Sequence, residues 1–197
     1  MEIGHDSDMR TLALVLMGEF AKVQDSIDGL VGMYFARRTP GMQWYLKQKG
    51  IPSRIRDSER PRLVVSIAAD LGTTSDLSNF TETYERLKEI RDYTGHSVRV
   101  DFLNSDTIVL TKQFFQSGGG TPQPSLTVTR QELMTGHRDA LWLLHHVHYI
   151  IASSDLSVRT FLGDRAIRYV EPTPSPAEWD EVAFVFVDEV GSTTAGR

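Results

Sequence analysis

The sequence predicts a mainly α protein, a helical bundle with an inserted β-hairpin and a short α/β extension at its C-terminus. Two long segments, 9–38 and 129–153, carry apolar residues at alternating spacings of four and three, the period of a helix face that packs against other helices. Between them, segment 98–115 alternates with the period of two that strands show. We therefore expect a helical domain over residues 1–155 and an extension over 156–197.

The first half of the chain carries start and stop signals for two helices. Asp8 can cap the first helix, and the Thr-Pro-Gly sequence at 39–41 ends it. Its apolar stripe consists of Leu16, Phe20, Val23, Ile27, Leu30 and Tyr34. A second helix is expected from a cap at Ser58, with Pro61 in its first turn, to a stop at Gly72.

A third helix and a hairpin follow. Ser75 or Ser78 opens the helix, which we expect to end near Gly95. Its apolar face consists of Phe80, Tyr84, Leu87 and Ile90. Two β-rich runs on either side of the turn at 104–106 then predict a hairpin, and 126–128 predicts a further short strand.

The last long helix begins at a capping box formed by Thr129 and Glu132. Its predicted stripe consists of Leu133, His137, Ala140, Leu144, Val147 and Ile151. Beyond it, 155–170 suggests a short amphipathic piece, and 182–187 reads as one strand without a partner in the tail. We expect that strand to join the edge of the hairpin or another subunit, and 191–197 to be disordered.

Composition excludes several classes of chemistry. The chain has 197 residues, of which 40% are hydrophobic and 24% charged, as in an ordinary globular protein. It has no cysteine, which excludes disulfides, thiolate zinc sites, iron–sulfur clusters and a cysteine nucleophile. The net charge of −5 lacks the basic footprint of a protein that coats nucleic acid, so any RNA contact requires a local basic patch. We expect a cytoplasmic protein with no membrane segment, because the longest apolar run, 12–17, is far too short to span a bilayer.

One short pattern suggests a catalytic site. Arg91 and His96 stand at the end of the third predicted helix, and Gly95 is expected to let the chain leave the helix and return His96 toward Arg91. An arginine beside a histidine can hold a phosphate and offer a group that titrates near neutral pH. The structural alternative is that Arg91 pairs with Glu85, Glu89 or Asp92, while His96 only occupies a helix terminus.

The segment Arg91-Asp92-Tyr93-Thr94-Gly95-His96 resembles the Arg-polar-x3-His signature of the HEPN family, a family of all-α domains associated with nucleic acids. The long first helix, the hairpin and the capped last helix are similar to HEPN-like variants in which strands separate the last two helices. The resemblance covers about residues 9–153.

This resemblance implies a metal-independent endoribonuclease without a cofactor, acting as a homodimer in which two motifs face each other. Arg91 would hold the scissile phosphate, His96 would act as general acid or base, and Asp92 would orient one of them. Such proteins occur in RNA processing, in phage defence and in toxin–antitoxin systems, which makes RNA and an antitoxin or other protein the expected partners. Other family members are non-catalytic binding or dimerisation modules, which is the first alternative.

The densest basic run is a candidate RNA-binding segment, formed by Arg54, Arg56, Arg60 and Arg62. The alternative is that these arginines solvate a connector and pair with Asp57 and Glu59.

The histidines of the last helix suggest a second alternative function. His145 and His148 lie at i, i+3 on one face, a spacing that metal ligands use, and His137 or Asp139 could complete the set. A core or interface role for these histidines, His146 included, is the competing interpretation. One of them could also join the Arg91/His96 site.

Overall fold

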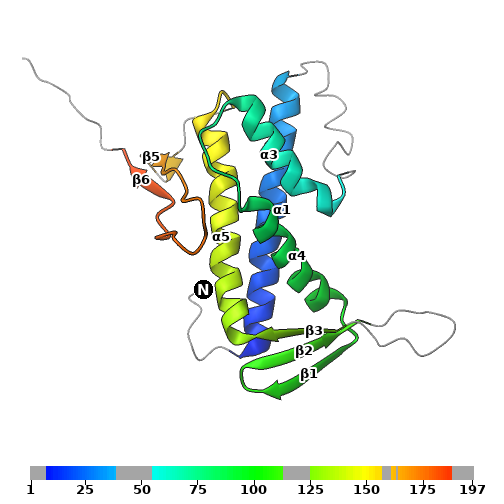
Figure 1. The fold of residues 1–197 in the computed structure, drawn as a ribbon. Coiled ribbons are helices and arrows are strands. Elements are labelled where there is room, and N and C mark those ends of the chain that lie inside the picture. The colour runs from blue at the N-terminus through cyan, green and yellow to red at the C-terminus, as the bar shows by residue number, and fades with distance from the viewer. Residues whose placement is uncertain (1–7, 39–54, 113–124, 157–160, 163, 188–197) are drawn as a thin grey trace, which may run out of the picture. The chain divides into compact units, whose positions relative to one another are not determined.

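The computed structural model describes residues 8–38, 55–112, 125–156, 161–162 and 164–187. Helices make up 59% of it, which confirms the mainly α prediction. The helices are α1 (Met9–Arg38), the short 3-10 turn η3 (Asp57–Glu59), α3 (Arg60–Leu71), α4 (Phe80–His96) and α5 (Arg130–Ser153) (Figure 1). In these described ranges, no helix is long and apolar enough to cross a membrane.

Two small antiparallel sheets accompany the helices. The first has the order β1–β2–β3 and consists of β1 (Arg99–Asn104), β2 (Thr107–Thr111) and β3 (Ser125–Thr129). It confirms the predicted hairpin and adds the predicted short strand to it. The second has the order β4–β5–β6 and consists of β4 (Phe161–Leu162), β5 (Arg165–Tyr169) and β6 (Phe184–Phe186).

The chain divides into two compact units, each of which draws on both long helices. Unit 1 comprises Met1–Ser26 and Ser78–Leu144, and unit 2 comprises Ile27–Leu77 and His145–Arg197. The first half of α1, all of α4, the first sheet and most of α5 therefore belong to unit 1.

The core of unit 1 is aromatic and tightly packed. Phe20 of α1 contacts Tyr84 of α4 with 4.9 Å between ring centroids, and Phe80 lies 6.3 Å from Trp142 of α5. All four rings are fully buried. The sheet adds Ile108, Leu110 and Val128 to this core.

A glycine sets the spacing of the three helices in unit 1. A Cβ atom at Gly136 of α5 would lie 3.2 Å from the Cδ2 atoms of both Leu16 on α1 and Leu87 on α4. Contacts this short require the leucines to shift, so the absence of a side chain at Gly136 is what lets the helices approach.

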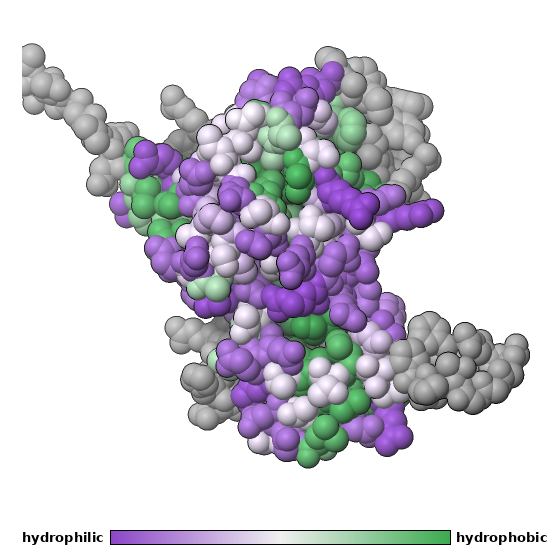
Figure 2. Space-filling view, in the orientation of Figure 1, coloured by the Kyte–Doolittle hydropathy of each residue, from purple (hydrophilic) through white to green (hydrophobic). Residues whose placement is uncertain are grey.

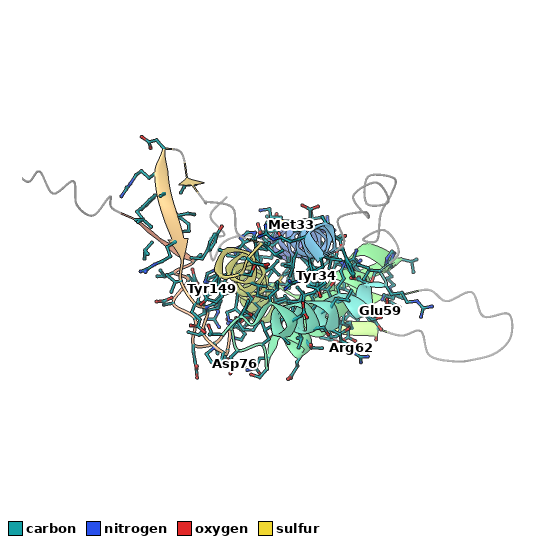
Figure 3. The ribbon with its side chains drawn as sticks, turned by 90° about the horizontal axis from the view of Figure 1, so that it is seen from above. Met33, Tyr34, Glu59, Arg62, Asp76 and Tyr149 are labelled. Atoms are coloured by element: carbon teal, nitrogen blue, oxygen red, sulfur yellow. The ribbon has the colours of Figure 1, made fainter. Side chains whose placement is uncertain are left out.

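Unit 2 packs the second half of α1 against α3. Its core includes Ile27, Leu30, Val64, Ile67, Val147 and Ile150. The Tyr34 hydroxyl donates a hydrogen bond to Asp70 of α3 (2.9 Å), which raises the pKa of Tyr34 (Figure 3). Gly72 ends α3 as predicted, because its φ of 68° lets the last turn close on the Ala68 and Ala69 carbonyls.

The tail differs from its prediction. We expected the strand at 182–187 to pair outside the tail. It is β6, and it pairs with β5 inside the tail, with Ile167 opposite Phe186 and Tyr169 opposite Phe184. The amphipathic piece expected over 155–170 supplies β4 and β5. Apolar periodicity did not reveal this pairing, because β5, with the sequence Arg-Ala-Ile-Arg-Tyr, does not alternate apolar and polar residues.

The helix starts and the stripe of α5 also need correction. The N-caps of α3 and α4 are Glu59 and Asn79 rather than the predicted serines. The α5 capping box is confirmed, with Glu132 accepting hydrogen bonds from the Thr129 backbone N–H and hydroxyl (both 2.7 Å). Three members of the predicted stripe, His137, Leu144 and Ile151, are only partly buried, and the buried face instead consists of Leu133, Gly136, Ala140, Leu143, Val147 and Ile150.

We predict that two glycine-to-alanine changes on long helices have different effects. A Cβ atom added at Gly18 of α1 would have no neighbouring atom within 4 Å, so Gly18→Ala should stabilise the protein by about 0.8–1 kcal/mol through helix propensity alone. Gly136→Ala should gain less or nothing, because the two leucines must move. Gly136→Leu should destabilise by roughly 1–3 kcal/mol through overpacking.

Urea denaturation of the three variants measures these differences. Equal stabilisation by both alanine variants would show that the contact at Gly136 does not limit the approach of the helices.

Candidate functional site

The motif residues lie on the last two turns of α4, within unit 1. Arg91 is partly buried: its guanidinium carbon lies 5.4 Å from the centroid of the Phe20 ring on α1, and its Nη1 atom lies 3.2 Å from Oδ1 of Asp92. Asp92 also accepts a hydrogen bond from Lys88 one turn earlier (3.2 Å). The Asp92 carboxylate is thus held between two cations, and Arg91 has the carboxylate partner that the structural alternative predicted.

The expected return of His96 toward Arg91 is wrong. Helix α4 continues through Gly95 and includes His96 as its last residue, with Ser97 as the C-cap. Gly95 contacts α1, where its Cβ position lies 3.6 Å from the Met17 methyl carbon. On a continuous helix, residues five positions apart are rotated by about 140° and separated by about 7.5 Å along the axis, so the side chains of Arg91 and His96 diverge.

Asp92 and His96 share a helix face instead. They are four residues apart, the spacing that brings side chains of adjacent turns together. His96 is exposed at the helix end, whereas Arg91 and Asp92 are partly buried. The structure therefore pairs Arg91 with Asp92 and places His96 one turn further along the helix face of Asp92.

An open groove of about 580 Å³ runs along the neighbouring face of α4. Its lining contains four carboxylates, Glu82, Glu85, Glu89 and Asp92, and three cations, Arg86, Lys88 and Lys112. Lys112 follows β2 and lies 4.0 Å from the centroid of the Tyr93 ring. The carboxylates outnumber the cations, so the groove is not a positively charged channel of the kind that tracks a nucleic-acid backbone.

Two of these groups were missed by the sequence analysis. Lys112 reaches Tyr93 only because the first sheet returns β2 to the end of α4, and no local pattern signals that. Arg86 forms an ion pair with Asp139, which is buried on α5. Asp139 was expected to be a possible metal ligand. Its ion pair with Arg86, a residue 53 positions earlier in the chain, gives it a structural role instead.

The predicted RNA-binding arginines divide into different roles. Arg60 is bound to carboxylates, with Nε and Nη2 each 3.0 Å from the two oxygens of Asp28 and Nη1 3.3 Å from Asp57. Arg56 and Arg62 are exposed, and Arg62 lies on the outer side of α3 (Figure 3). Arg54 lies outside the described residues. The described arginines belong to unit 2 and the motif belongs to unit 1, so the two sets fall in different units.

Three histidines of α5, His145, His146 and His148, lie in unit 2, whereas His137 lies in unit 1 and is partly buried. His145 is 2% exposed and stacks on Trp179, with 5.9 Å between ring centroids. His146 is fully buried, and its Nδ1 atom lies 2.8 Å from the Ser75 hydroxyl. His148 lies beside Tyr169 of β5, at 5.7 Å between ring centroids. These contacts confirm the core interpretation for His145 and His146.

Burial keeps these histidines neutral. It lowers the pKa of His145 from 6.5 to about 4 and that of His146 to about 3, and it also lowers the pKa of His148. Neighbouring histidines lower the pKa values of His145 and His146 further, whereas Asp180 and Asp76 partly oppose the effect.

The metal alternative finds no support in the described part of the chain. There, no group of three His, Cys, Asp or Glu side chains is placed to hold a metal ion. Together with the burial of His145, this finding argues against a site built on His137, His145 and His148.

Comparison of the chain with protein-family models, curated proteins and solved structures finds no significant match.

We predict that acid destabilises the protein through the buried histidines. In the unfolded chain a histidine takes up a proton near pH 6.5, whereas folded His145 resists protonation until about pH 4. The contribution of these histidines to the free energy of unfolding is therefore complete above pH 6.5 and is lost as the pH falls toward 4. Each histidine lowers the free energy of unfolding by up to about 1.4 kcal/mol for each pH unit in this range.

Urea denaturation at pH 7.5 and 4.5 tests this, with His145→Phe as the matched variant. That variant keeps an aromatic ring against Trp179 but removes one titrating group, so its stability should fall less between the two pH values. An equal fall in both proteins would contradict the assignment.

Proposed function

We propose that the C-terminal end of α4 is a site of metal-independent RNA cleavage, as the resemblance to the HEPN family implies. The observation that supports this proposal is the arrangement of the motif: an arginine bonded to Asp92 at 3.2 Å, with an exposed histidine on the face of Asp92 one turn later. Asp92 orients the Arg91 guanidinium, and the exposed position of His96 leaves it open to a substrate.

The chemistry requires only these side chains and the RNA itself. His96, in its neutral form, removes the proton of a ribose 2′-hydroxyl. The 2′-oxygen then bonds to phosphorus while the bond from phosphorus to the 5′-oxygen breaks. The leaving oxygen takes up a proton from solvent water, and protonated His96 returns its proton to the solvent. The products are a 2′,3′-cyclic phosphate and a 5′-hydroxyl. Arg91 neutralises phosphate charge beside this centre.

The divergence of Arg91 and His96 limits how one chain can act. Their side chains leave the helix about 140° apart, so in one chain Arg91 contacts a phosphate next to the one that is cleaved at His96, and the RNA strand must bend around the end of α4 to reach both side chains. We therefore infer a single-stranded, flexible substrate rather than a duplex.

We predict that His96→Ala lowers the rate of RNA cleavage by at least about 100-fold, the lower range for loss of a general acid or base. Arg91→Ala should also lower the rate, because the phosphate charge is no longer neutralised. EDTA should have no effect. The measurement is cleavage of a labelled single-stranded RNA, with detection of cyclic-phosphate ends.

Lys22→Ala is the matched control for the loss of positive charge. Lys22 is an exposed residue of α1 in the same unit and pairs locally with Glu19 (2.9 Å). This variant should cleave at the wild-type rate. Undiminished cleavage by His96→Ala would overturn the proposal.

The second candidate is a non-catalytic binding or dimerisation module. The excess of carboxylates in the groove and the neutralisation of Arg91 by Asp92 favour it, because both weaken attraction to a phosphate backbone. A partner such as an antitoxin would then bind stoichiometrically. Complex formation without turnover of any RNA selects this function over cleavage.

A further inference from the structure

Strand β1 exposes an apolar face that its neighbours in the sheet bury. Val100 and Phe102 are 45% and 47% exposed, and Val98, directly before the strand, is 62% exposed. The ladder partners of the two strand residues are core residues: Val100 lies opposite Leu110, and Phe102 lies opposite Ile108. The core face of the sheet therefore extends onto β1 without being covered there. Hydrophobic side chains reach the surface at this end of unit 1 (Figure 2).

The two edges of this sheet differ in chemistry. Figure 1 shows β1 at the outer edge, and in the described ranges no strand pairs with its free side. The opposite edge, β3, presents Ser125, Thr127 and Thr129. Natural edge strands usually carry lysine, proline or a bulge that blocks pairing with another chain. β1 has neither lysine nor proline, and its register shift begins only after Phe102.

The residues of β1 are complementary to themselves in an antiparallel arrangement. We propose that β1 pairs with β1 of a second copy of this chain about a two-fold axis at Val100, giving a continuous six-stranded sheet. Val100 then lies opposite its own copy, Val98 opposite Phe102, and Arg99 opposite Asp101. The five paired residues, 98–102, stop where the register shift begins.

The charges select this register. Arg99 and Asp101 already lie together on one face of β1, with 2.8 Å between Nε and Oδ2. With the axis at Val100, two copies place these charges in two opposite-sign pairs. An axis at Asp101 would place two carboxylates against each other, and an axis at Arg99 would do the same with two guanidinium groups. A register displaced by one residue would place Val100 opposite a charged residue of the other copy, Arg99 or Asp101.

The apolar face gains cover in the same arrangement. The exposed side chains of Val98, Val100 and Phe102 meet those of the second copy, which removes apolar surface from water. Arg10 of α1 lies over Phe102, with 5.2 Å from the guanidinium carbon to the ring centroid, so one end of this face is already partly covered. The uncovered remainder is the part that the second copy would contact.

Dimerisation through β1 is independent of RNA cleavage. In this register Val98, which follows the motif in one copy, lies opposite Phe102 of the other, so the two motifs stand at opposite ends of the paired strands. Each copy then carries its own Arg91, Asp92 and His96, in contrast to the facing motifs that the family resemblance implies.

Charge exchange between copies tests the pairing. Arg99→Asp and Asp101→Arg each replace the two opposite-sign pairs by like-charge pairs, and each should weaken dimerisation by roughly tenfold. A mixture of the two variants should restore it, because every pair then joins opposite charges across the interface. Analytical ultracentrifugation of the full chain over a dilution series measures the dimer, and thermal melting monitors the fold.

The mixture is the decisive arm. An effect of the Arg99–Asp101 pair within one chain would not be repaired by mixing, because each chain keeps its own like charges. Thr127→Glu on the β3 edge is the matched control and should leave the dimer intact. A monomeric wild-type chain, a dimer that neither single variant weakens, or a mixture that stays monomeric would each overturn the proposal.

Discussion

The close approach of three helices at Gly136 is the constraint on which the rest of unit 1 depends. Leu16 of α1 and Leu87 of α4 lie where a larger residue on α5 would have its side chain. This approach lets Phe20, Tyr84 and Trp142 fill the core, and it holds α4 against α1 at Phe20 and Met17. The geometry of the motif at the end of α4 follows from that packing.

The last turn of α4 lies against α1 and does not break at its glycine. A Cβ atom at Gly95 would lie 3.6 Å from the Met17 methyl carbon, an ordinary van der Waals distance. A glycine at this point of a sequence suggests a helix stop, but here the helix continues to His96. As a result His96 stays on the helix, shares a face with Asp92 and diverges from Arg91.

In unit 2 the histidines of α5 show how context decides the role of a residue. His145 and His148 have the spacing of metal ligands, yet their rings contact Tyr169, and His145 also stacks on Trp179. Tyr169 and Trp179 come from the tail, which folds into its own small sheet against this face of α5. Aromatic contacts and burial favour the neutral imidazole, which gives these residues a packing function.

The sequence by itself determined the long helices, the hairpin and the capping box of α5, because periodicity, turn residues and caps act over a few neighbouring positions. It also singled out Arg91, Asp92 and His96 as a motif, and it offered Asp92 as one of three possible carboxylate partners of Arg91. The tertiary structure alone decided that α4 continues through Gly95, that Asp139 is paired with Arg86, that β6 pairs with β5, and that β1 is left with an exposed apolar face. Each of these outcomes depends on which distant segment of the chain packs against the element in question. Contacts between residues far apart in the chain leave no periodic pattern in the sequence.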